Sequence, residues 1–346
     1  MTDMMEKLPT ELMQEVVEYS DEPTIHSFTI VSLKYCRIAQ PLIFRHISIS
    51  EMTSERFALF VEQMQNNNKL ALMMKVLIIN KQFATELLQH LFEIVSNLED
   101  FRIPGSIVNS LLSPPYFPKL RCLHIYYPVF LNDIITDFIP RHEFLNDLKI
   151  PSVPDGSTRD AVTLSMLPLE CAAATSVNRL VTYHGPPDLL RLLTPNSSMK
   201  HFTSSQQLDE GTLRKLSRVV SSGLLSLIID DPMDPTHYKT LPASLIPSLF
   251  PNLRSIAWLS VNSISASAID HLPHLRRIWF RSTHSGGLPE SVQAFITTIM
   301  EFSAKNNRAL REIRLYAACG NPSSHTYSKT SVWSHETGLP VKPFVS

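Results

Sequence analysis

Three stretches of the sequence share one pattern and decide the fold: FPKLRCLHI (Phe117–Ile125), FPNLRSIAW (Phe250–Trp258) and LPHLRRIWF (Leu272–Phe280). After the proline and one further residue, each continues with a hexad whose first, fourth and sixth places are apolar. A proline stops a preceding helix, and the alternation at the end of the hexad is typical of a short strand. Each stretch therefore predicts a helical or irregular segment that ends just before a strand.

The same apolar-x-x-apolar-x-apolar hexad recurs along most of the chain. Successive copies start 22 to 35 residues apart, which is the signature of a repeat architecture. The stronger copies begin at Leu98, Leu120, Leu145, Leu224, Leu253, Leu275 and Leu310, and the weaker ones at Phe44, Met74, Val177 and Met199.

Helical patterns fill the intervals between hexads. Apolar residues recur at helical spacing in residues 53–68, 83–95 and 288–302. A strand, a helix and another strand make a crossover unit with parallel strands and a right-handed connection. The chain has only 9 glycines, which disfavours tight hairpins. We therefore expect an α/β fold built from stacked units, with an ordinary doubly wound α/β domain as the alternative.

These features resemble the leucine-rich-repeat family over residues 44–318. Repeats of about 20–29 residues and a Leu-x-x-Leu-x-Leu strand are typical of that family. The chain departs from the family pattern because no Asn or Cys stands three places after the hexads, where Gln82, Ser106 and Pro128 are examples of what is found. The resemblance implies an irregular leucine-rich-repeat solenoid with a curved parallel sheet.

A different pattern precedes the repeats. In KLPTELMQEVVEYS (Lys7–Ser20), Leu8, Leu12, Val16 and Tyr19 form one stripe of a predicted helix. Two further helical patterns follow the break at residues 20–23. Three helices of this length are too few to bury a core alone, so we expect apolar surface that is left for a partner.

Residues 8–49 resemble the F-box, with Leu-Pro-x-Glu-Leu at its start, Val31-Ser32 as the second landmark and PLIFRHISI as an exit sequence typical of fungal members. The family usually has Cys and Trp where Ser32 and Tyr35 stand. The resemblance implies an F-box at 1–43 that binds a Skp-family adaptor and, through it, a cullin. Interior packing is the alternative role for several of the residues that it assigns to the adaptor surface, which are Leu8, Pro9, Leu12, Val16, Phe28, Val31 and Tyr35.

The x positions of the later hexads are rich in arginine. In a leucine-rich solenoid these positions face away from the core, so they would lie on neighbouring strands. We hypothesise that they bind an acidic or phosphorylated protein segment, since the guanidinium fork suits carboxylate and phosphate, with a solvated sheet face as the alternative. The residues concerned are Arg254, Arg276, Arg277, Trp279, Arg281, Arg311 and Arg314.

Composition excludes several function classes. With 31 Lys and Arg against 32 Asp and Glu, no net field points to nucleic acid or a membrane surface. No apolar run reaches the roughly 18 residues of a membrane span, and no apolar leader is evident. The four cysteines lie far apart, so we expect reduced thiols in the cytoplasm or nucleus, without metal or cofactor.

No catalytic motif is present, neither a nucleophile elbow nor a phosphate loop nor a zinc-protease helix. The two resemblances together imply a non-enzymatic substrate-recognition subunit of an SCF-type ubiquitin ligase, with an F-box at 1–43, a recognition domain at 44–318 and a C-terminal tail at 319–346. The alternatives are a leucine-rich scaffold acting outside ubiquitination and an α/β enzyme.

Overall fold

The computed structural model describes two compact units, Met1–Leu145 and Asn146–Ser346. The fold is α/β, and the boundaries predicted at 43 and 318 stay predictions. The residues that the structure describes are 9–110, 115–126, 138–150, 179–187, 189, 198–204, 208–220, 223–229, 245–260, 269, 271–282, 294, 297–299, 301, 309–318 and 327–334.

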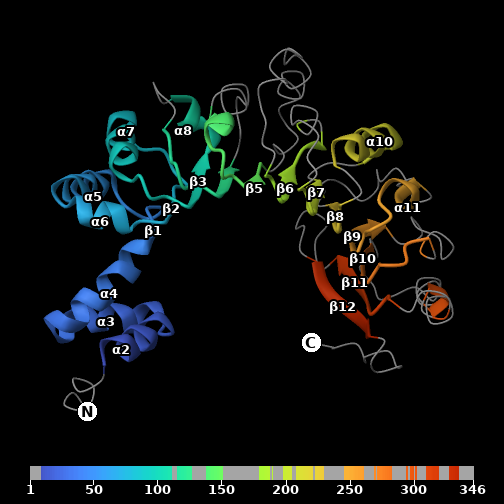
Figure 1. Ribbon diagram of the computed structural model, residues 1–346, viewed down its shortest axis with the longest axis horizontal. Coiled ribbons are helices and arrows are strands. Elements are labelled where there is room, and N and C mark those ends of the chain that lie inside the picture. The colour runs from blue at the N-terminus through green and yellow to red at the C-terminus, as the bar shows by residue number, and fades with distance from the viewer. Residues whose placement is uncertain are drawn as a thin grey trace. The chain divides into compact units, whose positions relative to one another are not determined.

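The first unit begins with three helices, α2 (Thr10–Glu18), α3 (Glu22–Val31) and α4 (Leu33–Arg45). They form a group of their own, joined to the first strand by the end of α4 (Figure 1). The Asp21 carboxylate accepts a hydrogen bond from the Thr24 N–H at 3.0 Å and starts α3, and the Ser32 hydroxyl accepts one from Tyr35 N–H and starts α4. The interruption of the helical pattern at residues 20–23 is therefore the place where α2 ends and Asp21 caps α3.

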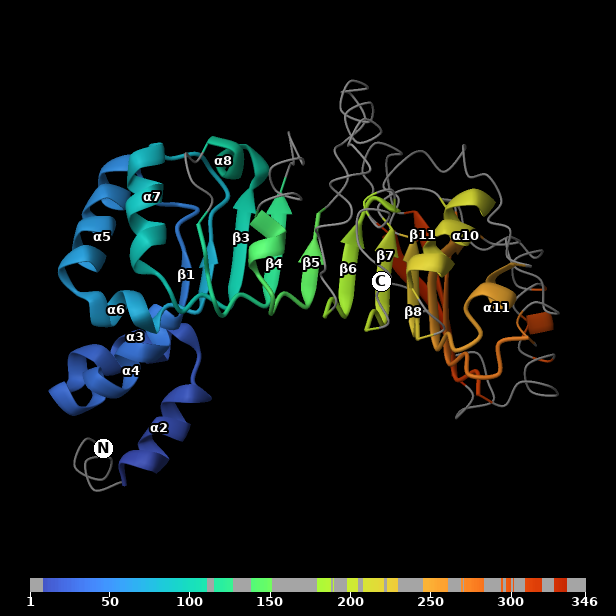
Figure 2. The same cartoon turned by 45° about the horizontal axis from the view of Figure 1, so that its top comes forward.

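The rest of the first unit alternates strands with helices. Aromatic residues fill the space between them. The ring centroid of Phe101, on strand β3 (Asp100–Pro104), lies 5.4 Å from that of Phe92, on helix α7 (Thr85–Ile94), and 5.2 Å from that of Phe117. Helices α5 and α7 lie along one side of the strands (Figure 2). On the other side, which we call the open sheet face, the strand residues Val76, Ile78 and Arg102 are half-buried. The elements are β1 (His46–Ser48), α5 (Ser54–Asn66), α6 (Asn68–Met73), β2 (Val76–Ile78), α7 (Thr85–Ile94), β3 (Asp100–Pro104), α8 (Gly105–Ser110), β4 (Cys122–Tyr126) and η2 (Ile139–Arg141).

Two of the three helices predicted between the hexads, at 53–68 and 83–95, appear as expected. Helix α5 begins after Thr53, whose hydroxyl accepts a hydrogen bond from Arg56 N–H. Helix α7 occupies the second pattern, where Leu88 is buried and its neighbour Leu87 is half-buried. The third pattern, at 288–302, falls mostly outside the described residues, although Ile299 is buried within a described turn of helix.

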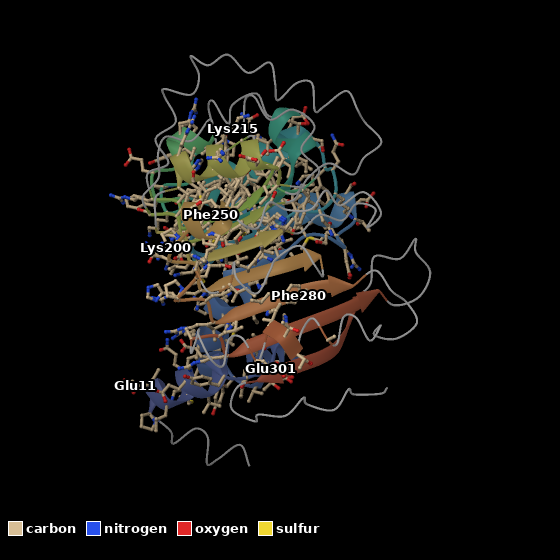
Figure 3. The ribbon with its side chains drawn as sticks, turned by 90° about the vertical axis from the view of Figure 1, so that its right-hand side faces the viewer. Glu11, Lys200, Lys215, Phe250, Phe280 and Glu301 are labelled. Atoms are coloured by element: carbon tan, nitrogen blue, oxygen red, sulfur yellow. The ribbon has the colours of Figure 1, made fainter. Side chains whose placement is uncertain are left out.

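The second unit carries its strands in chain order. Neighbouring strands from β5 to β11 are parallel, while β12 pairs antiparallel with β11. Phe250 and Phe280, both labelled in Figure 3, are buried at 1% and 0% exposure. The elements are β5 (Asp147–Lys149), β6 (Thr182–Gly185), β7 (His201–Ser204), α10 (Glu210–Val219), β8 (Ser226–Ile229), α11 (Ile246–Leu249), β9 (Ser255–Ser260), β10 (Arg277–Ser282), β11 (Glu312–Ala318) and β12 (Tyr327–Ser334).

In both units, the residues at the fourth place of neighbouring hexads pair with one another across adjacent strands. In the first unit Ile47 pairs with Leu77, Leu77 with Phe101, and Phe101 with Leu123. In the second unit the same place forms one unbroken row of partners, which are Leu148, Tyr183, Phe202, Leu227, Ile256, Ile278 and Ile313. The hexads therefore lie side by side within each unit, as predicted.

A second backbone feature recurs in many hexads, at the residue just after the first apolar one. The carbonyl of this residue accepts hydrogen bonds from two successive N–H groups of the next copy. Lys75 O, for example, accepts from Glu99 N and Asp100 N at 2.8 and 2.9 Å, and Arg254 O accepts from Arg276 N and Arg277 N at 2.8 and 3.1 Å. This double contact aligns the starts of neighbouring strands.

The copy predicted to begin at Val177 is wrong by three residues. The paired strand places Tyr183 opposite Leu148 and Phe202, so this copy starts at Leu180 and continues with Tyr183 and Gly185. An apolar template does not recognise tyrosine followed by glycine. Here the Tyr183 hydroxyl turns back to donate to Pro186 O at 2.9 Å, and a Cβ on Gly185 would lie 2.6 Å from that hydroxyl oxygen.

The segment predicted as a tail contains a regular element. Strand β12 pairs with β11 from Glu312↔Ser334 to Ala318↔Tyr327, although the sequence pattern predicts no strand there. The remainder of residues 319–346 lies outside the described residues.

Candidate functional site

Helix α2 divides its apolar side chains between two faces. Met13 and Val17 are 1% exposed and pack inward. Leu12 is 48% exposed, Val16 42% and Tyr19 91%, and their spacing places them along one side of the helix. An apolar stripe of this kind beside a filled core indicates a surface that another molecule can cover.

The junction of α3 and α4 adds further exposed apolar side chains. Ile30 is 86% exposed, Val31 51% and Leu33 79%. They flank Ser32, the residue that ends α3 and caps α4. Because α2 packs against both of these helices, the helical group presents apolar side chains from all three. We call this set, Leu12, Val16, Tyr19, Ile30, Val31 and Leu33, the helical apolar face.

The predicted adaptor-contacting residues fall into three classes. Pro9, Leu12, Val16 and Val31 are exposed, as contact with a partner requires. Leu8 lies outside the described residues.

Phe28 and Tyr35 are the third class, because their rings pack against each other. Phe28 is half-buried, and its ring stacks on Tyr35 at a centroid distance of 5.5 Å. Tyr35 itself is 3% exposed, so it is a packing residue and its assignment to the surface is corrected. The ring occupies the space between α3 and α4, the same packing role that the sequence analysis left open for other members of the set.

Three members of the helical apolar face were not assigned to a partner from the sequence. Tyr19 belonged to the predicted stripe of α2, and this spacing was the signal that could have found it. Ile30 and Leu33 carry no such signal, because a helix boundary, not a periodic stripe, brings them to the surface.

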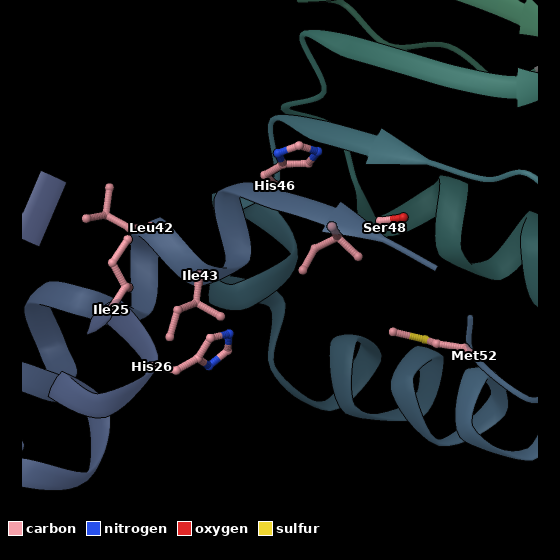
Figure 4. A pocket seen from close by; sticks show the side chains of 8 residues that line it. Ile25, His26, Leu42, Ile43, His46, Ser48 and Met52 are labelled. Atoms are coloured by element: carbon pink, nitrogen blue, oxygen red, sulfur yellow. The ribbon is translucent and has the colours of Figure 1, made fainter. Parts of the chain in front are cut away.

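A cavity of about 410 Å³ lies where α3 and α4 meet β1. Figure 4 shows Ile25 and His26 from α3 near Leu42 and Ile43 from α4, with His46 and Ser48 on β1 and Met52 beyond. The volume is within the range of small-molecule pockets. We assign it no ligand, since its lining offers apolar contacts and imidazoles without a charged group to select a chemistry.

The predicted arginine site is partly assembled by the second unit. Arg254, Arg276 and Arg311 occupy the same register position before β9, β10 and β11, because Arg276 N donates to Arg254 O at 2.8 Å and Arg311 N to Arg276 O at 2.9 Å. All three side chains are exposed. Neighbouring strands are about 4.8 Å apart, so these arginines form a short row, which we call the arginine row.

A charged network lies beside the arginine row. The Glu312 carboxylate pairs with Arg277 at 3.5 Å and, more closely, with Arg314. The Arg314 guanidinium lies over the Trp279 ring, 5.0 Å from its centroid. The structure thus joins Arg277, Trp279 and Arg314 through Glu312. The strand position of Arg281 is described, but its side chain lies outside the described residues.

The open sheet face of the first unit has a different arrangement of charge. Lys75 donates a hydrogen bond to Glu99 at 2.7 Å, and Arg102 pairs with Asp100 at 2.8 Å. The Lys75 hydrogen bond holds the pKa of the Glu99 carboxyl below its usual value, against a smaller effect of burial. Opposite charges therefore face each other on this sheet.

One histidine is buried and structural. His142 Nε2 accepts a hydrogen bond from Phe117 N–H at 3.0 Å, and its Nδ1 lies 2.7 Å from Phe138 O. Nδ1 must therefore carry the proton, so the ring is neutral. Burial is the main cause that lowers the pKa of His142. The ring holds two chain segments together.

Neither metal nor membrane chemistry is evident in the described part of the chain. Within those ranges no group of three His, Cys, Asp or Glu side chains could hold a metal ion. None of the described helices combines the length and apolarity needed to cross a bilayer. Cys36 and Cys122, the two described cysteines, are not joined in a disulfide.

Comparison with known proteins adds no assignment to this geometry: no family model and no curated protein sequence matches the chain.

Proposed function

We propose that this protein is the substrate-recognition subunit of an SCF-type cullin-RING ubiquitin ligase, located in the cytoplasm or nucleus. Its N-terminal helices bind a Skp-family adaptor in the manner of an F-box, and the parallel strands that follow bind a protein substrate in the manner of a leucine-rich-repeat domain. The chain catalyses no step itself. It brings a substrate to the ligase.

The helical apolar face is the observation that carries the proposal. Burying a Leu- or Val-sized side chain gains about 1.5–3 kcal/mol, and Leu12, Val16 and Tyr19 leave much of that gain unused in the isolated chain. The same helix carries the Leu-Pro-x-Glu-Leu sequence that resembles the start of an F-box. An apolar face on the elements with that sequence supports an adaptor as the partner.

The test is co-purification of the full chain with a Skp-family adaptor. The variant Leu12→Asp with Val16→Asp places two carboxylates in the helical apolar face, and we expect it to lose the adaptor. Gln14→Asp is the matched control, because Gln14 is exposed on another side of α2. Circular dichroism of each variant checks that the helices remain.

Three outcomes are informative. Loss of the adaptor in the double variant, with retention in Gln14→Asp, supports the proposal. Adaptor binding that the double variant retains contradicts the assigned surface. Failure of the unaltered chain to bind any Skp-family adaptor contradicts the function and leaves a binding scaffold outside ubiquitination as the better description.

A further inference from the structure

The arginine row and the charged network around Glu312 form a predominantly positive surface at the start of strands β9–β11. In the described residues of β8–β11 and of the turns that lead into them, Glu312 is the only carboxylate. Against it stand five arginines whose side chains are described, which are Arg254, Arg276, Arg277, Arg311 and Arg314. Among the described residues, no acidic side chain pairs with Arg254, Arg276 or Arg311.

The backbone fixes the spacing of this charge. Because the carbonyls of Arg254 and Arg276 each accept from the next arginine of the row, the three side chains start from neighbouring strands about 4.8 Å apart. Like charges at adjacent sheet positions are destabilising. The row therefore provides a local positive field that an anionic ligand can neutralise.

Glu312 indicates which anion fits. Its carboxylate already lies between Arg277 and Arg314, and only 19% of its side chain is exposed. Arg314 is held in turn by the Trp279 ring. The protein thus uses a carboxylate to bridge two strands at this place, and the arginine row offers the same guanidinium chemistry with no carboxylate partner among the residues that the structure describes.

We infer that the arginine row binds a Glu- or Asp-rich segment of a partner protein, which crosses strands β9, β10 and β11 at their starts. Carboxylates of the segment pair with Arg254, Arg276 and Arg311, and Trp279 lies beside them as an aromatic surface. This inference rests on the proposed function, since it names the chemical class of substrate that the recognition part selects.

The probe is a fluorescein-labelled Glu-rich peptide, titrated with the full purified chain and followed by fluorescence anisotropy. Its comparison peptides replace each Glu by Gln or by phosphoserine, and a single-stranded oligonucleotide of similar charge serves as a further competitor. We expect the Glu-rich peptide to bind, the Gln peptide not to bind, and the affinity to fall with rising salt.

The variants separate position from net charge. Arg276→Glu with Arg311→Glu should weaken peptide binding about 100-fold, since a hydrogen bond to a charged group is worth about tenfold or more. Lys215→Glu with Arg218→Glu makes the same change in net charge on α10, away from Phe280 and its strand (Figure 3), and should weaken binding less than about threefold. Arg276→Gln with Arg311→Gln removes charge without adding any and should also weaken binding.

Glu312→Gln should act in the opposite direction. It releases Arg277 and Arg314 from their internal partner, so the Glu-rich peptide should bind about threefold more tightly, as expected for the loss of a partly exposed competing pair.

Four results would overturn the inference. Equal losses in the arginine-row variant and the α10 variant would mean a non-specific charge effect. Binding of the Gln peptide would remove the role of carboxylate. Binding of only the phosphoserine peptide would assign the row to phosphate, and preference for the oligonucleotide would assign it to nucleic acid.

The adaptor assay keeps this inference separate from the proposed function. The variant Leu12→Asp with Val16→Asp should still bind the peptide, and the arginine-row variant should still bind the adaptor. A chain that binds the peptide but no adaptor would retain the arginine site and lose the ligase function.

Discussion

The open sheet faces of the two units have the same backbone plan but different charge patterns, with paired charges of both signs in the first unit and a row of arginines in the second. At the place after the first apolar residue of the hexad, the first unit has Lys75 and Glu99 joined at 2.7 Å. At the equivalent place the second unit has Arg254, Arg276 and Arg311 in succession. The difference teaches that the repeat fixes where a side chain lies and leaves its chemistry free.

The inward faces of the two units, in contrast, are alike. Phe101 and Leu123 in the first unit and Ile256 and Ile278 in the second are buried at 0% or 1% exposure. Each occupies the fourth place of its hexad and pairs with its equivalent on the next strand. Inward positions are constrained by packing in both units, so the two faces of one strand are under different physical demands.

The largest expected effect tests whether the inward-facing residues of both units are equally important for stability. Phe101→Ala should lower the free energy of unfolding by about 3–5 kcal/mol, and Ile278→Ala by about 2–5 kcal/mol, because each removes fully buried atoms and leaves a cavity. Urea denaturation followed by circular dichroism measures both. Arg102→Ala and Arg277→Ala, on the outward face, are the controls and should each cost less than about 1 kcal/mol; a larger cost would mean that the outward face is also part of the core.

The next effect concerns the irregular copy in the second unit. Gly185→Ala should cost about 1–3 kcal/mol, because the new Cβ would lie 2.7 Å from Ile150 O and 2.6 Å from the Tyr183 hydroxyl oxygen. Thermal unfolding measures the loss. The double variant Tyr183→Phe with Gly185→Ala removes the hydroxyl contact but keeps the contacts with Ile150 O and with the ring carbon Cζ, so it should recover only part of the loss; full recovery would show that these remaining contacts are unimportant.

A third prediction concerns the pH dependence of stability that the buried His142 gives to the first unit. Because burial lowers the pKa of His142, the unfolded chain binds the proton more readily than the native one. The contribution of this ring to stability is complete above the ordinary histidine pKa of about 6.5 and is lost progressively as the pH falls toward the lower native value.

The measurement is the free energy of unfolding between neutral and mildly acidic pH. His142→Gln keeps a donor and an acceptor but does not titrate, so its stability should depend less steeply on pH. Equal pH dependence in the two proteins would contradict the assignment of a neutral, buried ring in the first unit.

The smallest effect tests the paired charges of the first unit. Glu99→Gln should lower stability by less than about 1 kcal/mol at neutral pH, because both partners are partly exposed. The pKa of Glu99 is lowered, so its contribution exists above the unfolded pKa and disappears as the pH falls through the native one. Urea denaturation at neutral and acidic pH should show the difference only at neutral pH; a difference that persists at both would point to lost packing.

The strand register could be predicted from the sequence because it depends on a local pattern. Apolar residues at the first, fourth and sixth places of a hexad report which side of a strand is buried, and this held for weak copies such as Phe44 and Met74. The pattern failed at Tyr183 and Gly185, where a hydroxyl group fills the place of a missing side chain. Strand β12 was missed because its pairing with β11 depends on contacts that the local composition does not encode.

The candidate surfaces could be predicted only in outline. On α2, Leu12–Val16 and Met13–Val17 are equally apolar, and the helix periodicity cannot tell which pair faces the core. The packing of α2 against α3 and α4 decides that Met13 and Val17 are covered. Tyr35 illustrates the same limit, because only the fold reveals that its ring stacks on Phe28.

The reversed direction of β12 has a consequence for self-association. A parallel strand at the border of a sheet exposes a row of N–H and C=O groups that a second molecule can pair with. Along β11, from Glu312 to Ala318, that row is occupied by β12 of the same chain. Proteolytic removal of this last strand would move the border of the described sheet from the antiparallel β12 to β11 and leave the N–H and C=O groups of β11 that β12 now pairs open to a second molecule.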